Sequence, residues 1–450
     1  MITKIIHRIW NERRQNIWLF IELIVASIFL WLAIDPLFTL VCRNNIPRGY
    51  DVEKVYQIKP GTYYHSHPKF RRGETNSETM ATFMQQLKAT LSSTPEIENW
   101  CMVGSTFEPN SLSYAMYEFH CDSTETPDGK SRVLKVRVYD IPPEYANSFF
   151  ETLKIRNAIT GEVMTQMGNR ENINIYVSRS AALKFYDTID IVGRKIYNDR
   201  AYKNGYNIIG VIEDIQMLNY DEYTPVVFLE RSEGDIMGID GFRHNIVFKL
   251  KESVDEDSFI KKFNEEIAPK IAAGNHYCSE LKSYKEILQQ HNIRFGITNK
   301  YRLFTGLSGF ALFCAFMGVF STFWIRANSR RRDIGIMRCM GATNGSIVRQ
   351  FTLEAMILVT LAFIVALPLL THYIYIEGFV EPLAKVPSWV EKSNDYAPDQ
   401  SYLHNRKGAH FAIVSLVCYL FITAIAAIGS LIPAVRIARS LPADTLREQQ

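Results

Sequence analysis

The sequence has little that would suit an enzyme or a nucleic-acid-binding protein. Its formal net charge is only +3, from 50 Lys and Arg against 47 Asp and Glu. No long basic run occurs outside the flanks of its apolar segments. HExxH and Gly-x-Ser-x-Gly motifs are absent, and the 7 cysteines form no CxxC pair. We therefore expect no nucleic-acid partner, no catalytic residues and no metal site in this chain.

A nucleotide-binding P-loop is also missing. Such a loop needs Gly-x-x-x-x-Gly-Lys-Ser/Thr, so that backbone amides and the lysine can hold phosphates. The nearest approach is Gly129-Lys130-Ser131, where Thr124 occupies the first glycine position. We therefore expect this chain to bind no nucleotide or other cofactor.

Apolar residues are instead concentrated in a few long blocks. Residues 17–34, 303–325, 351–370 and 411–432 are nearly all apolar, and each can cross a hydrocarbon core about 30 Å thick. We therefore predict four transmembrane helices, over 17–41, 303–325, 351–376 and 410–432.

Basic residues near the ends of these blocks predict their orientation. The leader 1–16, the connector 326–350 and the tail 433–450 all carry an excess of Lys and Arg, and the connector has six arginines against one acid. Both termini are therefore expected in the cytoplasm, with residues 42 to about 300 on the other side. We interpret the first block as an uncleaved anchor because it exceeds a signal-peptide core. Lipidation of Cys42 is a weaker alternative, since Val41 is bulky for the preceding position.

The external region is expected to be an α+β domain. Periodicity predicts a helix over 77–92 and another over 256–268. Strand-like runs cover 133–139, 174–177, 208–212, 226–229 and 246–250. Glycines near 158–172 suggest a soft boundary between two subdomains, and 278–302 has the composition of a continuous helical stalk. Cys101 and Cys121 are the closest external pair for a disulfide.

Three segments carry a resemblance to a known family. The connector RRRDIGIMRCMGATNGSIVRQFTLEA, the C-terminal PAVRIARSLPADTLRE, and the external run from NINIYVSRS to TPVVFL resemble FtsX-like, MacB-type ABC transporter permeases. The loop 377–409 is longer than the hairpin typical of that family, and its role is open.

The resemblance implies a membrane α-helical fold of four transmembrane helices, with a large α+β extracytoplasmic domain of two subdomains inserted between the first two. The expected order is as follows: leader 1–16, first span 17–41, MacB-like periplasmic core domain 42–277, stalk 278–302, second span 303–325, coupling connector 326–350, third span 351–376, external loop 377–409, fourth span 410–432 and cytoplasmic tail 433–450. The expected location is the bacterial inner membrane.

The connector is the predicted site of coupling to an ATPase. A helix from Asp333 to Met340 would place Ile334, Met337 and Met340 or Gly341 along one side, and Gly341 would end it. The residues assigned to coupling are Arg331, Arg332, Asp333, Ile334, Gly335, Met337, Arg338, Gly341 and Ala342. A plain basic loop that binds anionic lipid headgroups is the alternative interpretation.

The resemblance also implies partners. ATP and Mg²⁺ would be bound by a separate ABC ATPase subunit, and an ATPase dimer implies a second permease copy, identical or homologous. Small residues at helical spacing, Ala311 with Ala315 and Ala426 with Ser430, suit either packing inside one subunit or a dimer contact. Membrane lipid and a periplasmic adaptor or substrate protein are further expected partners.

Two functional classes follow. The first is mechanical transmission from the ATPase to the periplasmic domain, for export of a peptide or toxic compound or extrusion of a lipoprotein. The alternative is a non-transporting signalling or scaffold protein that controls a periplasmic cell-wall hydrolase.

Overall fold

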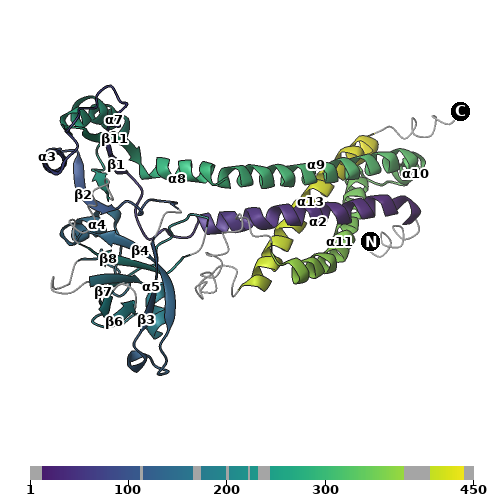
Figure 1. The fold of residues 1–450 in the computed structure, drawn as a ribbon. Coiled ribbons are helices and arrows are strands. Elements are labelled where there is room, and N and C mark those ends of the chain that lie inside the picture. Colours follow the sequence, from purple (N-terminus) through teal and green to yellow (C-terminus); the bar gives the residue numbers. More distant parts are fainter. Residues whose placement is uncertain are drawn as a thin grey trace. The chain divides into compact units, whose positions relative to one another are not determined.

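A computed structural model of the chain describes residues 13–111, 115–165, 174–198, 202–220, 223–231, 244–379 and 406–439. The chain forms two compact units (Figure 1). The described parts of 1–42, 297–385 and 402–450 form a helical unit, and residues 43–296 contribute an α+β unit.

The helical unit contains four long apolar helices. They are α2 (Arg13–Asn44), α9 (Ile297–Ser329), α11 (Asn344–Glu377) and α13 (Lys407–Arg439). Their mean hydropathy over a spanning window lies between 1.9 and 2.6, and each exceeds the roughly 20 residues that a bilayer requires. The four apolar helices agree with the predicted membrane-spanning segments. Most of the loop 377–409, and the ends of the predicted leader and tail, lie outside the described residues.

Small side chains allow these helices to approach one another inside one chain. Ala311 and Ala315 of α9 and Ala426 and Ser430 of α13 are all buried. A Cβ added to Gly429 of α13 would lie 3.2 Å from a methyl of Val319 in α9. Their burial agrees with packing within one subunit, and a dimer contact stays a prediction.

One half of the α+β unit is an antiparallel sheet covered by helices. Its strand order is β10-β11-β1-β9-β2. The bounds are β1 Val55–Thr62, β2 Ile97–Gly104, β9 His244–Leu250, β10 Ala272–Ala273 and β11 His276–Ser283. Helices α3 (Ser77–Ser93) and α7 (Glu256–Lys262) share an apolar core with this sheet. The helix predicted over 77–92 is confirmed, and Asn76 caps it, accepting a hydrogen bond of 2.9 Å from the Thr79 amide.

The other half is a closed barrel with strand order β3-β4-β8-β5-β7-β6. Its strands are β3 Ala115–Cys121, β4 Val133–Ile141, β5 Asn174–Ser178, β6 Lys195–Asn198, β7 Tyr202–Ile212 and β8 Val226–Glu230. Helix α5 (Arg179–Tyr186) shares the barrel core, whereas α4 (Ala146–Leu153) packs against β2 and β9 of the sheet. Full closure leaves the barrel without free strand edges.

The predicted subdomain boundary near 158–172 is wrong, and part of it lies outside the described residues. Strand β4 precedes that boundary, yet it pairs in parallel with β8, which follows it. The barrel, from β3 to β8, is instead inserted between β2 and β9 of the sheet. Glycines mark local turns, whereas strand pairing over long sequence separation decides which strands share a barrel.

The predicted continuous stalk over 278–302 is also wrong. Strand β11 ends at Ser283 and pairs with β1 along most of its length. The Ser283 hydroxyl then accepts the Glu286 amide at 3.1 Å and starts α8 (Tyr284–Arg294). Gly296 has a φ of 72°, which interrupts the helical path before α9 begins at Ile297.

The pairing of Cys101 with Cys121 is wrong as well. Cys101 is buried in the core shared by Phe107 and Tyr139, and Cys121 is buried in the barrel core; both are free thiols. Burial raises the pKa of Cys121 and raises that of Cys101 to about 12. Neither thiol is therefore poised for thiolate chemistry.

Candidate functional site

The connector forms a short helix between two long ones. Helix α10 (Arg331–Cys339) follows α9 directly (Figure 1). Asp333 lies in its first turn, where a carboxylate suits the helix dipole. Gly341 has a φ of 93°, and the Ala342 amide donates to the Met337 carbonyl at 2.9 Å, so the predicted end at Gly341 is where the helix closes. Thr343 then caps α11, accepting the Ser346 amide at 3.3 Å.

One face of α10 is anchored in the helical unit. Ile334 is 1% exposed and belongs to the same apolar core as Ile347 and Phe351 of α11. Met337 is half-buried against that core, and Gly335 is buried. Ile334 and Met337, which were predicted to share one side of the helix, therefore lie together, and that side packs against the helical unit itself.

The opposite face is apolar and exposed. Ile336 is 44% exposed and Met340 is 75% exposed, and Asp333 and Cys339 are also exposed. We call Ile336 and Met340 the apolar docking pair. The prediction that Met340 shares one side with Ile334 and Met337 is wrong, because Met340 is the exposed C-cap of α10 whereas Ile334 is buried.

The remaining predicted coupling residues differ in exposure where the structure describes their side chains. Arg338 and Ala342 are half-buried and Gly341 is exposed. Arg331 and Arg332 lie in the first turn of α10, and their side chains are outside the described ones. Sequence reasoning missed Ile336, although its spacing of four residues from Met340 is the helical signal for a shared face.

Two connector arginines are buried and share one carboxylate. Arg326 Nη1 of α9 lies 2.8 Å from Glu354 Oε1 of α11, and Arg330 Nη1 lies 3.1 Å from Glu354 Oε2. The side chains of Arg326 and Glu354 are 4% and 1% exposed, and that of Arg330 is 9% exposed. We call these three residues the arginine clamp.

Aromatic rings complete the clamp. The Arg326 guanidinium lies 5.3 Å from the Phe323 ring centre, and the Arg330 guanidinium lies 5.9 Å from that of Phe351. The sequence suggested only that both arginines are charges of a cytoplasmic loop. It did not predict that they bind a buried carboxylate. The available signal was the position of Glu354, an acidic residue at the start of the third predicted span.

A second buried polar pair lies at the other end of the helical unit. His410 Nε2 of α13 lies 2.6 Å from Asp35 Oδ1 of α2, and both side chains are fully buried. The rings of Phe38 and Phe379 pack against His410, with centres 5.8 Å and 5.1 Å away. Within the same helix pair, Trp31 Nε1 donates to Ser415 Oγ at 3.1 Å.

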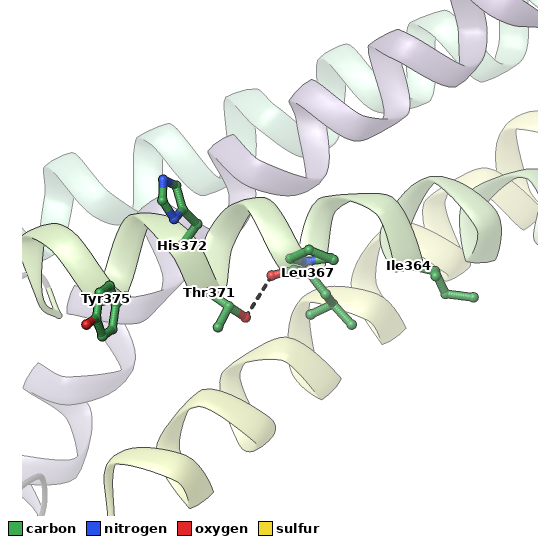
Figure 2. Close-up of a pocket in the computed structure, with 6 residues that line it drawn as sticks. Ile364, Leu367, Thr371, His372 and Tyr375 are labelled. Carbon is green, nitrogen blue, oxygen red and sulfur yellow. Dashed lines mark hydrogen bonds between the residues drawn. The ribbon is translucent and has the colours of Figure 1, made fainter.

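An open hollow lies along α11, beyond the clamp. Its lining residues are Ile364, Leu367, Pro368, Thr371, His372 and Tyr375. Figure 2 shows the five labelled side chains projecting from this single helix, with the Thr371 hydroxyl bonded to the Leu367 carbonyl at 2.9 Å. Because one helix supplies the whole lining, the hollow is a feature of a helix surface and not an enclosed binding site.

These features define a membrane protein with a large α+β unit in the chain between its first two apolar helices, and with a helical connector anchored at one end of the bundle. Comparison with known proteins specifies the class further. Residues 305–442 match the family described as "FtsX-like permease C-terminal". This part of the chain is therefore similar to an FtsX-like permease domain, in agreement with the resemblance seen in the connector and the C-terminal segment.

A curated relative points to the same class. The chain is 27% identical over 201 residues to YknZ of Bacillus subtilis (strain 168), described as an uncharacterized ABC transporter permease. That alignment covers 42% of this chain and 45% of the relative, so the chain spans about half the length of the protein it matches.

Solved structures show a distant likeness. The periplasmic region of MacB from Actinobacillus actinomycetemcomitans is 14% identical, with a TM-score of 0.31, over 55% of this chain and 95% of that one. The extracellular domain of YknZ from Gram-positive bacteria is 9% identical, with a TM-score of 0.26, over 50% of this chain and 100% of that one.

Proposed function

We propose that this chain is the transmembrane subunit of an ATP-driven transporter in the bacterial inner membrane. A separate ABC ATPase docks on α10 and binds ATP and Mg²⁺, and its closure moves the outer α+β unit mechanically. The observation that carries the proposal is the two-sided connector helix, buried through Ile334 and exposing the apolar docking pair at its other face.

The chemistry of that face suits a protein groove. An amphipathic helix that enters a groove uses apolar anchors spaced three or four residues apart, and Ile336 and Met340 have that spacing. Met is adaptable at binding surfaces because its side chain is flexible and polarisable. Arg331, Arg332 and Arg338 supply the charge expected to meet acidic groups around the groove.

The proposed function requires the membrane topology that the basic residues predict. Both termini and α10 face the cytoplasm, and the α+β unit lies outside. An ATPase dimer requires two permease copies, identical or homologous, and a periplasmic adaptor or substrate protein would bind the outer unit. Export of a peptide, a small toxic compound or a lipoprotein is consistent with this arrangement.

The docking face is tested by substitution. Ile336→Asp with Met340→Asp should reduce the amount of ATPase that co-purifies with the full-length chain from membranes by at least about tenfold, since apolar anchors dominate such interfaces. The same loss is expected on charge reversal of Arg331, Arg332 and Arg338.

Ile293→Asp is the matched control. Ile293 lies in α8 of the α+β unit and is 64% exposed, so its substitution should leave ATPase recovery unchanged. Full ATPase recovery with the Ile336 and Met340 variant would defeat the docking assignment. An ATP-independent complex that activates a cell-wall hydrolase would instead favour the scaffold function.

A further inference from the structure

The arginine clamp joins three successive helices at a single carboxylate. Arg326 and Arg330 lie four residues apart, one turn, at the end of α9. Arg330 is also the residue that precedes the first turn of α10. Glu354 lies ten residues after the start of α11, which is about 15 Å along its axis. The two contacts therefore reach from the α9–α10 junction into the body of α11.

From this geometry we propose that Glu354 is a positioning residue that makes the connector ends of α9, α10 and α11 move as one body. A displacement of α10 then reaches two membrane-spanning helices together. The proposal rests on the proposed function in one respect, namely that a partner displaces α10.

The physical reason is that the clamp is directional, whereas the apolar contacts around it are not. Burial of Ile334 and Met337 holds α10 near the bundle but resists sliding weakly, because the hydrophobic effect depends on area and not on direction. The charge-assisted bonds at 2.8 Å and 3.1 Å have narrow distance and angle requirements. A shift of about 1 Å between α9 and α11 would lengthen them beyond bonding distance.

Burial enforces the arrangement. Removing one partner of a buried ion pair is costly, so loss of the Glu354 carboxylate would weaken how both guanidinium groups are held. The start of α10 is then expected to be held less firmly. The clamp residues are buried while the apolar docking pair is exposed, so the two functions are separable by substitution.

The first experiment needs no ATPase. Hydrogen exchange of the α10 amides, 331–339, is measured in the full-length chain reconstituted in lipid nanodiscs. Glu354→Gln keeps the shape of the side chain and removes its charge, and we expect it to speed exchange in α10 by about tenfold, because local opening becomes easier. Glu377→Gln is the matched control, since Glu377 is an exposed carboxylate on the same helix.

Conservative variants separate positioning from folding. Arg330→Lys keeps the charge but loses the planar fork, and it should give an intermediate increase in exchange. Glu354→Asp keeps the carboxylate and should recover part of the protection. If Glu354→Gln does not fold, the lysine and aspartate variants decide the question. Wild-type exchange of α10 in folded clamp variants would overturn the proposal.

The second experiment measures whether an ATP-dependent change reaches the α+β unit. With the co-purified ATPase present, Glu354→Gln should retain wild-type ATPase recovery but lose most of the ATP-dependent change in hydrogen exchange of residues 43–296. An undiminished change would contradict the clamp. If the wild-type chain recovers no ATPase, the proposed function fails, while the exchange of α10 still decides whether Glu354 positions it.

Discussion

His244 is buried, and burial disfavours the protonated form of its imidazole. It lies in β9 opposite Gly104 of β2, and its side chain is 2% exposed. Burial lowers its pKa to about 4, against the opposing influence of Glu144. Burial also lowers the pKa of His276 in β11. Neutral histidines thus belong to the folded α+β unit.

The lowered pKa of His244 predicts a loss of stability in acid. Its folded pKa lies below the unfolded value of 6.5, so the unfolded chain binds more protons between pH 6.5 and 4. The contribution of neutral His244 to the free energy of unfolding is therefore complete above pH 6.5. It falls as the pH drops toward 4, and about 2 kcal/mol is lost at pH 5. The midpoint of thermal unfolding of the full-length protein at pH 7.5 and pH 5 measures it.

His244→Gln supplies the comparison for this prediction. Glutamine has no titration in this range, so the variant should lose less stability between pH 7.5 and pH 5 than the wild type does. An identical loss in both proteins would show that other groups cause the acid sensitivity.

At the scale of elements, the pair of Asp35 and His410 joins the first and last apolar helices. Both side chains are fully buried, and removal of one partner from a buried pair typically costs about 3–5 kcal/mol. Asp35→Asn is therefore expected to lower the thermal midpoint of the full-length protein in nanodiscs.

A double substitution tests whether the pair is the cause. Asp35→Leu together with His410→Phe removes both polar groups, and such apolar replacements are often neutral or stabilising. The double variant should be more stable than Asp35→Asn alone. Asp35→Leu and His410→Phe are also measured singly. If their effects on stability simply add up in the double variant, a direct interaction is contradicted.

Local patterns in the sequence predicted elements well. Phe83, Met84, Leu87 and Leu91 recur at helical spacing and are the buried side of α3. Runs of β-branched and aromatic residues marked β4, β5 and β8. The helix predicted over 256–268 begins as α7 but continues from Phe263 as a single π turn and from Ala268 as a 3₁₀ turn, a change of period that composition does not reveal.

Pairing between distant parts of the chain was not predictable in the same way. The parallel partner of β4 is β8, far along the chain, so the barrel has no local signature. Glu354 was hidden for a similar reason. A lone acid at the start of an apolar block has no visible partner until α9 and α11 bring Arg326 and Arg330 to it.

At the scale of the whole molecule, the two units have separate tasks in the proposed function. The helical unit holds α10 by a buried apolar face and a charged clamp, and its exposed apolar pair is the proposed docking surface. The α+β unit is joined to it in sequence at Arg43, in the last turn of α2, and again at Ile297, where α9 begins. We infer that displacement of α10 is delivered to the outer unit through these helices.

The central claim is that an ATPase displaces α10 and thereby moves the α+β unit. The most direct test is hydrogen exchange of the reconstituted complex with its ATPase, compared without nucleotide and after trapping with ADP and vanadate. The account predicts changes in α10, in the adjoining ends of α9 and α11, and in residues 43–296. Changes confined to the ATPase, with no response in the outer unit, would contradict it.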